Sequence, residues 1–383
     1  MRVLVAPDKF KFALDASAAA DAIAAGVRDA RPDADIVLCP LADGGEGTGR
    51  VLAAAAQAHQ EAASVLDPRG QPRLARWWRT EAGCAIIEMA EASGLALLEA
   101  SERNPLLTTS YGTGQLLAAA ANAECLRVQL CVGGSATVDG GAGCLQALGW
   151  EMLDTYGRVI DSPMTGGLLG HVRELLPPAT TTELHVAILC DVDNRLLGPR
   201  GAAAVFGPQK GATPDQVAEL ERGLTHWADL LRDATRRDPR DVPGSGAAGG
   251  LPAGLYAACR ARLVRGFSLV AREVGLEAKM AGTNVCLTGE GRIDAQTLAG
   301  KVVAGVAELA ARHSVPTVAF AGAVVPLPGQ SQEGLAAQLG LRRIVTLSPP
   351  GEALEQSLQQ TATRLRAAAA ALVADAAAGP GAP

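Results

Sequence analysis

Short apolar runs alternate with Ala- and Leu-rich helical runs along nearly the whole chain, and this alternation restricts the fold most. Strand-like runs followed by helical stretches occur at residues 3–6, 36–40, 126–132, 283–287, 315–321 and 344–347. The helical stretches that follow them lie near residues 16–31, 47–60, 141–148, 301–313 and 331–339 and from residue 353 onward. Short apolar strands separated by helices are typical of largely parallel sheets buried on both faces. The sequence therefore predicts an α/β fold.

The middle of the chain is less regular. Residues 75–79 and 84–90 both resemble strands and lie close together in sequence, which predicts some antiparallel pairing. Residues 236–250 are polar and glycine-rich and predict an exposed loop or hinge. We interpret the chain as two α/β domains. Residues 1–68 and 265–383 form a Rossmann-like domain with a mostly parallel sheet, and residues 69–264 form a second α/β domain inserted into it.

Composition excludes several classes of function. Of 383 residues, 34 are Lys or Arg and 40 are Asp or Glu, so the net charge of −6 predicts neither nucleic-acid nor membrane partners. Aromatic residues make up only 3%, too few for a base-stacking platform. No signal peptide or membrane span is evident. The eight Cys form no C-x-x-C pair and predict buried free thiols in a reducing cytoplasm.

Charged and glycine-rich residues follow the strand-like runs, where parallel sheets place their active sites. Asp8, Lys9 and Lys11 follow the first run and suit an anion or a metal-bound phosphate, although an ordinary charged turn explains them equally well. Asp43 and Glu46 flank two glycines just before a helical stretch. Two carboxylates held in this way suit Mg²⁺, and the alternative is a helix cap with a turn.

Two glycine-rich segments precede helical runs. Gly112 and Gly114 fit a helix start that cradles phosphate, but Gly-x-Gly alone is a weak signal. Residues 131–143 contain five glycines, two hydroxyl residues and an acid, which is what a backbone nest for phosphate requires. Neither a Walker A loop nor a dinucleotide fingerprint fits this spacing. A purely structural glycine turn is the alternative.

A further loop follows the apolar run at residues 185–190. Asp191 and Asn194, three apart, resemble a general base or Mg²⁺ ligand with its companion, or an Asx turn. Lys210 lies between glycines at 207 and 211 and could neutralise a transferring phosphoryl group. Lysine is scarce here, with only five among the 34 basic residues, and four of the five lie in these marked segments.

The last loop follows residue 287. Glu290 and Asp294 are acids spaced by glycines, and Arg292 between them can hold a carboxylate through two hydrogen bonds. A chance cluster is the alternative for this loop alone. Six such loops in one α/β chain together indicate a polyanionic substrate with a metal.

Taken in order, these loops resemble the bacterial glycerate kinase family often called type II. The resemblance runs from residue 6 to about residue 305 and includes the segments at 6–11, 42–48, 111–114, 133–141, 190–194, 207–211 and 288–297. Phe12 and Ala13 depart from the Gly-Ser of the family pattern, and Arg195 stands where Pro usually follows Asn194. Val138 stands where Asn is frequent.

The resemblance implies ATP- and Mg²⁺-dependent phosphorylation of D-glycerate, with 2-phosphoglycerate as the expected product. Asp191 would orient or deprotonate the hydroxyl, with Asp8 as the alternative. The remaining implied roles are phosphoryl-charge stabilisation by Lys11 and Lys210, Mg²⁺ binding by Asp43, Glu46 and Glu290, ATP-phosphate binding by Gly112, Gly114, Gly133, Gly134, Ser135 and Thr137, and glycerate binding by Arg292, Asp294 and Asn194. We expect a cytoplasmic monomer or homodimer.

Two other functions compete with this interpretation. Phe12 and Ala13 suggest a non-catalytic relic of the kinase that binds nucleotide or sugar acid, against which the retained acids and lysines argue. A dinucleotide-dependent oxidoreductase is disfavoured because no Gly-x-Gly-x-x-Gly follows the first strand.

Overall fold

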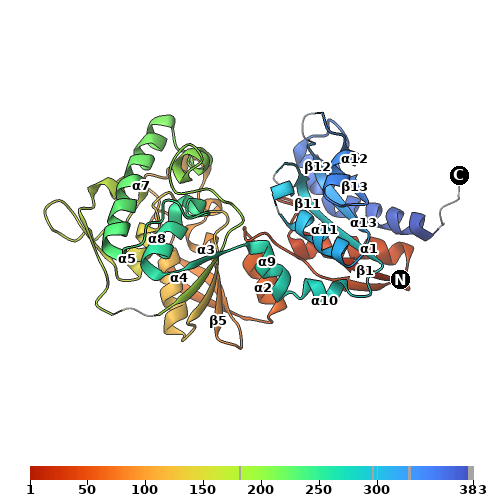
Figure 1. The fold of residues 1–383 in the computed structure, drawn as a ribbon, viewed down its shortest axis with the longest axis horizontal. Coiled ribbons are helices and arrows are strands. Elements are labelled where there is room, and N and C mark those ends of the chain that lie inside the picture. Colours follow the sequence, from red (N-terminus) through yellow and green to blue (C-terminus); the bar gives the residue numbers. More distant parts are fainter. Residues whose placement is uncertain (181–182, 296, 300, 327–328, 378–383) are drawn as a thin grey trace. The chain divides into compact units, whose positions relative to one another are not determined.

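The computed structural model describes residues 1–180, 183–295, 297–299, 301–326 and 329–377. Contacts divide the chain into two compact units (Figure 1). Unit 1 contains Met1–Asp43, Arg50–Ala55 and Phe267–Pro383, and unit 2 contains Gly44–Gly49 and Ala56–Gly266. These units differ from the predicted domain division chiefly in assigning residues 56–68 to the inserted part. The boundaries at residues 68 and 265 stay a prediction.

Unit 1 is built on a five-stranded parallel sheet in the order β13-β12-β11-β1-β2. Its strands are β1 (Arg2–Val5), β2 (Asp35–Leu38), β11 (Val285–Ile293), β12 (Thr317–Val324) and β13 (Arg343–Thr346). The chain proceeds from β1 to β2 on one side and later from β11 to β13 on the other. The strand order therefore reverses between β1 and β11, and ligands bind at such a switch point in open α/β sheets.

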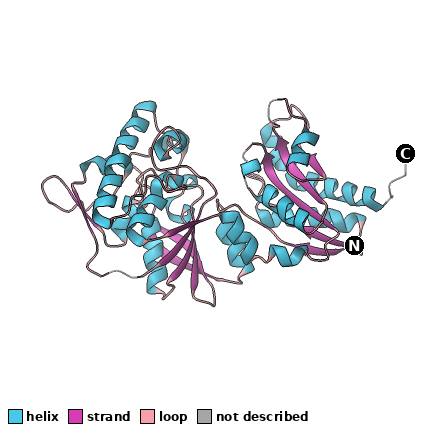
Figure 2. Ribbon diagram, in the orientation of Figure 1, coloured by secondary structure: helices cyan, strands magenta, loops and turns pink. Residues whose placement is uncertain are grey.

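Both faces of the unit 1 sheet are buried. Val318 and Phe320 of β12 pack with helices α1 and α13 on one face, whereas Ala319 and Ala321 pack with α11 and α12 on the other. This alternation follows from the twofold period of a strand. Figure 2 shows helices beside the strands of the sheet. The helices assigned wholly or mostly to unit 1 are α1 (Ala16–Ala30), α2 (Thr48–Ala55), α9 (Gly266–Glu273), α10 (Leu276–Met280), α11 (Val302–Arg312), α12 (Gln332–Gln338) and α13 (Leu354–Ala377).

Unit 2 contains a six-stranded mixed sheet in the order β10-β9-β6-β5-β4-β3. The first four strands in this order are parallel, and β4 and β3 add an antiparallel edge. This confirms the antiparallel pairing predicted for residues 75–79 and 84–90. The strands are β3 (His59–Leu66), β4 (Pro72–Arg79), β5 (Cys84–Glu88), β6 (Arg127–Cys131), β9 (His185–Leu189) and β10 (Arg262–Val264), with β7 (Glu151–Leu153) and β8 (Glu174–Leu176) forming a separate pair.

The helices of unit 2 surround one large apolar core that includes Trp77, Leu116, Leu145 and Trp227. They are α3 (Ala90–Ser93), α4 (Tyr111–Asn122), α5 (Ala142–Ala147), α6 (Ala202–Phe206), α7 (Pro214–Thr235) and α8 (Leu251–Cys259). The α7 N-terminus has a capping box in which Thr213 and Gln216 satisfy each other's backbone N–H groups. The predicted fold class, two α/β units with a Rossmann-like mostly parallel sheet in one, is confirmed.

Two details differ from the sequence predictions. The helix expected at residues 47–60 ends at Ala55, because Gln57 adopts a left-handed φ of 49° and β3 begins at His59. The segment expected to be exposed at residues 236–250 is buried from Gly244 onward. The small residues in this segment allow its backbone to enter the core. Their composition is also typical of a surface loop, which is why the sequence predicted exposure.

Candidate active site

Asp8 follows the carboxyl end of β1, and Glu290 lies in the second half of β11, the adjacent strand across which the sheet order reverses. The N–H of Asp8 donates a 2.8 Å hydrogen bond to the carbonyl oxygen of Gly289, which joins the loop after β1 to β11. Asp8 is 4% exposed and Glu290 is 6% exposed. Buried carboxylates are rare unless they are paired, so these two mark a candidate functional site.

Burial sets the titration of both acids. It raises the pKa of Asp8 to about 7, with Asp43 adding repulsion and Lys9 opposing the shift. Burial likewise raises the pKa of Glu290 to about 7, although Thr297 Oγ1 donates a 2.7 Å hydrogen bond to Glu290 Oε1. A carboxyl group with a pKa near 7 can accept and release a proton at neutral pH.

Asp43 and two lysines complete this cluster in unit 1. Lys9 Nζ lies 3.3 Å from Asp43 Oδ1 and 3.9 Å from Asp8 Oδ1. Lys301 lowers the pKa of both Asp8 and Glu290 by its charge. Sequence reasoning named Lys9 only as one of a charged group suited to an anion, and it assigned no role to Lys301 or Thr297, although the scarcity of lysine was a signal for both lysines.

The donor set has the chemistry that suits a hard cation. Asp8 and Asp43 both raise the pKa of Glu290, so the carboxylates repel one another and bound positive charge would relieve this. Within the described residues, no three acidic, histidine or cysteine side chains already form a metal cluster. Mg²⁺ is usually held by one or two carboxylates plus water and substrate phosphate, so the donors fit without such a cluster. Glu46, the third predicted ligand, belongs to unit 2 and is exposed.

Lys11 and Phe12 lie in a tight turn after β1. The turn is closed by the hydrogen bond from Phe10 N–H to the Leu14 carbonyl, and a Cβ on Gly291 would lie 3.0 Å from Lys11 N. Phe12 has a left-handed φ of 68° and is 82% exposed, with Lys11 Nζ 5.1 Å from its ring centre. A bulky residue in this conformation is strained.

Arg292 and Asp294 form an ion pair at the end of β11, with Arg292 Nε 3.0 Å from Asp294 Oδ2. The guanidinium is largely exposed and the carboxylate is not. Asp294 can therefore orient Arg292. Gln296, which belongs to the motif that carried the family resemblance, lies outside the described residues.

In unit 2, Asp139 occupies the helix starts that the glycine-rich segment was expected to offer to phosphate. The fully buried Asp139 carboxylate accepts hydrogen bonds from Ser110 N and Oγ and from the N–H groups of Gly141 and Gly143. Burial raises the pKa of Asp139, whereas these four hydrogen bonds lower it by a smaller amount. The protein's own carboxylate thus accepts from N–H groups at the start of α5 and from Ser110, the N-cap residue of α4.

Lys210 is buried against residues 135–137 of this glycine-rich segment. It is 1% exposed, and its Nζ donates 2.7 Å hydrogen bonds to Ser135 Oγ and to the Thr137 carbonyl. Burial lowers the pKa of Lys210 to about 7, partly offset by the charge of Asp139. The structure thus brings together three predicted residues, Lys210, Ser135 and Thr137.

The other predicted glycines are required by close packing. A Cβ on Gly112 would lie 1.9 Å from the Leu66 carbonyl oxygen, and one on Gly114 would lie 2.3 Å from the Cys144 carbonyl oxygen. A Cβ on Gly133 would lie 2.3 Å from Glu46 N, so the two glycine-rich loops meet backbone to backbone. Gly134 is exposed and has φ 72°. Gly133 and Gly134 therefore keep backbone near the surface of unit 2.

Asp191 and Asn194 follow β9 and both hydrogen-bond to the backbone of unit 2. Asp191 Oδ1 accepts a 2.9 Å hydrogen bond from Gly266 N, the first residue of α9. Asn194 Nδ2 donates a 2.7 Å hydrogen bond to the Arg200 carbonyl. Arg265 holds Asp193 through two hydrogen bonds of 2.9 Å. Asp191 therefore has a capping role whether or not it also acts on substrate.

A buried turn that sequence reasoning placed on the surface contacts the Thr137 segment. Ala248, Gly249 and Gly250 all have left-handed φ, and a Cβ on Gly249 would lie 1.8 Å from the Thr137 carbonyl oxygen. Ser245 and Thr137 each bury a hydroxyl without a hydrogen-bond partner. The dipeptide Gly249-Gly250 was the signal for this close approach.

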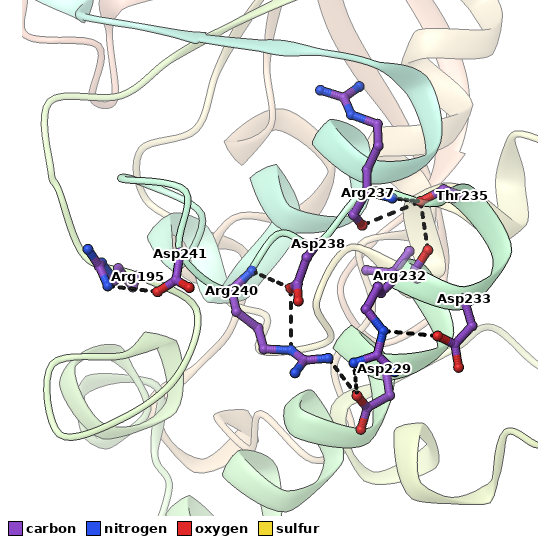
Figure 3. Close-up of polar contacts among 10 residues, drawn as sticks. Arg195, Asp229, Arg232, Asp233, Thr235, Arg237, Asp238, Arg240 and Asp241 are labelled. Carbon is purple, nitrogen blue, oxygen red and sulfur yellow. Dashed lines mark hydrogen bonds and ion pairs between the residues drawn. The ribbon is translucent and has the colours of Figure 1, made fainter.

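Surface ion pairs hold the segment that leads into this turn (Figure 3). Arg240 bridges Asp229 of α7 and Asp238, and Arg195 pairs with Asp241 at 2.7 Å. Single exposed pairs contribute little, but several charges acting together can order a loop.

Each unit taken by itself has a feature suited to phosphoryl transfer, namely the buried acids at the switch point of unit 1 and the glycine-rich loop of unit 2 that a buried lysine holds. That chemistry needs alignment, charge neutralisation and a proton acceptor more than covalent catalysis. The fold and site therefore define a phosphotransferase class. No helix in the described part of the chain is long and apolar enough to cross a membrane.

The model of the Glycerate kinase family matches residues 3–377, and the chain belongs to this family. It is 42% identical to "Glycerate 2-kinase" of Escherichia coli K12 over 85% of this chain and 86% of that protein. It is 40% identical to "Glycerate kinase" of Bacillus subtilis 168 over 94% of each chain. The crystal structure of the protein provisionally named glycerate kinase 2 from Salmonella typhimurium LT2 matches 99% of each chain with a TM-score of 0.83 and 38% identity.

Proposed function

We propose that the chain uses ATP and Mg²⁺ to phosphorylate D-glycerate and that the product is 2-phosphoglycerate. The buried pair Asp8 and Glu290 at the switch point is the observation that carries this proposal most directly. A carboxyl group with a pKa of about 7 is matched to accepting a proton from a substrate hydroxyl. The relatives named glycerate kinase and glycerate 2-kinase support the choice of substrate.

The sequence favoured Asp191 as the acceptor of the hydroxyl proton, with Asp8 as the alternative, and we now prefer Asp8 and keep Asp191 as the alternative. Asp8 is buried beside Lys9 and is not tied to a helix start, whereas Asp191 Oδ1 accepts from Gly266 N. Arg292, oriented by Asp294, would bind the glycerate carboxylate, and Asn194 stays a proposed substrate contact. Lys11, exposed after β1, would stabilise phosphoryl charge.

The ATP phosphates would contact the backbone of Gly133 and Gly134 and the hydroxyl of Ser135. Gly112, Gly114 and Thr137 stay proposed parts of the phosphate-binding site, with both glycines in tight backbone contacts and Thr137 buried. Asp43, Glu46 and Glu290 are the proposed Mg²⁺ ligands. Mg²⁺ would supply positive charge to phosphate oxygens during transfer. We place the reaction in the cytoplasm, because all eight Cys are free thiols.

Coupled ATP turnover with D-glycerate, with and without Mg²⁺, tests this function when ³¹P NMR identifies the product. Mg²⁺-dependent formation of 2-phosphoglycerate is expected. A 3-phospho product would overturn the proposed regiochemistry and keep the kinase. Absence of turnover with purified, folded protein would overturn the choice of glycerate as acceptor.

A further inference from the structure

Lys210 lies entirely inside unit 2, at the end of the short 3₁₀ helix Pro208–Lys210. The helix ends at Gly211, whose φ of 92° turns the chain, and a Cβ there would lie 2.2 Å from the Arg103 carbonyl oxygen. This close approach fixes the backbone at the base of the lysine. At 1% exposure the side chain is out of reach of a ligand in solution.

Both hydrogen bonds that Lys210 Nζ donates go to one short segment. Its Nζ donates to Ser135 Oγ and to the Thr137 carbonyl, each at 2.7 Å. The two acceptors lie on either side of Ala136, so one ammonium group fixes the course of three consecutive residues. Gly133 and Gly134, directly before this segment, are far less buried than Lys210.

The bond to Ser135 also determines where the Ser135 proton can point. A hydroxyl has one proton to donate and two lone pairs to accept with. Because Ser135 Oγ accepts from an ammonium group, its own proton must point away from Lys210. A bond from a charged donor polarises the hydroxyl and strengthens the bond that it donates in turn.

We propose that Lys210 is a positioning residue that fixes Ser135 so that its hydroxyl donates to an anionic oxygen of the bound substrate. The proposal rests on the proposed kinase function. The anionic oxygen belongs to the ATP phosphates or to the acceptor carboxylate, and the KM values for ATP and for glycerate distinguish these two sources. Lys210 itself touches no ligand.

Asp139 is the charged group that acts on Lys210 from the second half of the same loop. Its carboxylate is committed to Ser110, Gly141 and Gly143, so it offsets the lysine charge without competing with Ser135 for the ammonium hydrogens. The loop is therefore held by two buried opposite charges, each hydrogen-bonded to a different part of it.

A double-mutant cycle tests the proposal with Ser135→Ala, Lys210→Met and the double variant. Methionine keeps an unbranched side chain of similar length and removes the charge. Each single variant should lower kcat/KM by about 10- to 100-fold, the loss expected for a hydrogen bond to a charged group. If Lys210 acts through Ser135, the double variant should be no worse than Ser135→Ala within about threefold.

Losses that multiply in the double variant would overturn the proposal, as would a folded Lys210→Met with wild-type kcat/KM. A rise confined to KM for ATP assigns the anionic oxygen to phosphate, and a rise confined to KM for glycerate assigns it to the carboxylate. Circular dichroism checks folding, and Lys210→Arg, which retains the charge, should recover part of the lost activity. A Lys210→Arg variant as poor as Lys210→Met would also overturn the proposal.

A pH profile separates this role from a merely structural one. Burial lowers the Lys210 pKa to about 7, so wild-type kcat/KM should fall as Lys210 loses its proton above that pH. Ser135→Ala and Lys210→Met should both lack this fall of kcat/KM at high pH. If the fall persists in either variant, the positioning role of Lys210 is overturned. If the wild type transfers no phosphoryl group to glycerate, the proposed function fails. ATP binding measured by calorimetry in the same four proteins then tests the coupling by itself.

Discussion

The backbone N–H of Asp8 donates to the carbonyl oxygen of Gly289 at 2.8 Å, which places the acid of one loop beside the strand residue that precedes Glu290. Backbone atoms make this link, so substitution of either acid leaves it in place. The roles of the two carboxylates can therefore be tested by amide variants that preserve the local geometry.

Asp8→Asn should lower kcat by about 10²- to 10⁴-fold with little change in KM, because it removes the proposed proton acceptor. Asp191→Asn is the matched comparison, since Asp191 Oδ1 accepts from Gly266 N. It should lower stability by about 1 kcal/mol through the weakened cap and lower kcat much less. Steady-state kinetics and urea denaturation measure both effects. The reverse ranking of kcat would transfer the base role to Asp191.

Glu290→Gln should stabilise the protein in Mg²⁺-free buffer at pH 8 by about 0.5–2 kcal/mol while it abolishes activity. The folded-state pKa of Glu290 is raised to about 7, so the folded chain binds more protons than the unfolded chain between about pH 4.5 and pH 7. The wild-type free energy of unfolding therefore falls as pH rises through this window. The advantage of Glu290→Gln should be largest above pH 7 and absent near pH 4. Glu81→Gln, at an exposed carboxylate, is the control and should change stability little.

Gly112→Ala should destabilise unit 2 by more than about 2 kcal/mol, because a Cβ would lie 1.9 Å from the Leu66 carbonyl oxygen. Gly170→Ala is the control in the same unit, since nothing lies within 4 Å of its added Cβ. Thermal unfolding of both variants measures the difference. Equal melting temperatures would show that α4 can shift to make room.

Phe12→Gly should stabilise the protein by about 0.5–1 kcal/mol, because glycine adopts the left-handed φ of 68° without strain. Phe12→Ala keeps the strain and removes the same exposed ring, so it should show no such gain. Urea denaturation of the two variants separates backbone strain from the loss of the ring. A larger gain from alanine would show that ring exposure, not backbone strain, is the destabilising feature.

The sequence predicted the α/β class, the strand-end loops and the family, because each depends on local pattern. Asp8, Glu290 and Asp43 could be nominated from their loops, but their mutual repulsion depends on which strands are neighbours. Strand order is not a local property, so the sequence could not predict that these three acids form one cluster.

For other predicted residues, the sequence could not show the packing that the structure adds. Glycine looks the same in a sequence whether it serves a ligand or a tight helix contact, and Gly112 and Gly114 prove to make tight contacts. Ser245 lies in a segment whose composition is that of a surface loop, yet it is fully buried. Lys210 was read as a ligand contact because burial of a lysine leaves no trace in composition.

The carboxylate of Asp139 has a consequence for how unit 2 comes apart. It joins Ser110, at the start of α4, to Gly141 and Gly143, at the start of α5, across about thirty residues of chain. Neither helix can fray from its first turn without exposing a charge that the other helix also needs. The two helices should therefore lose amide protection together, as one cooperative opening unit.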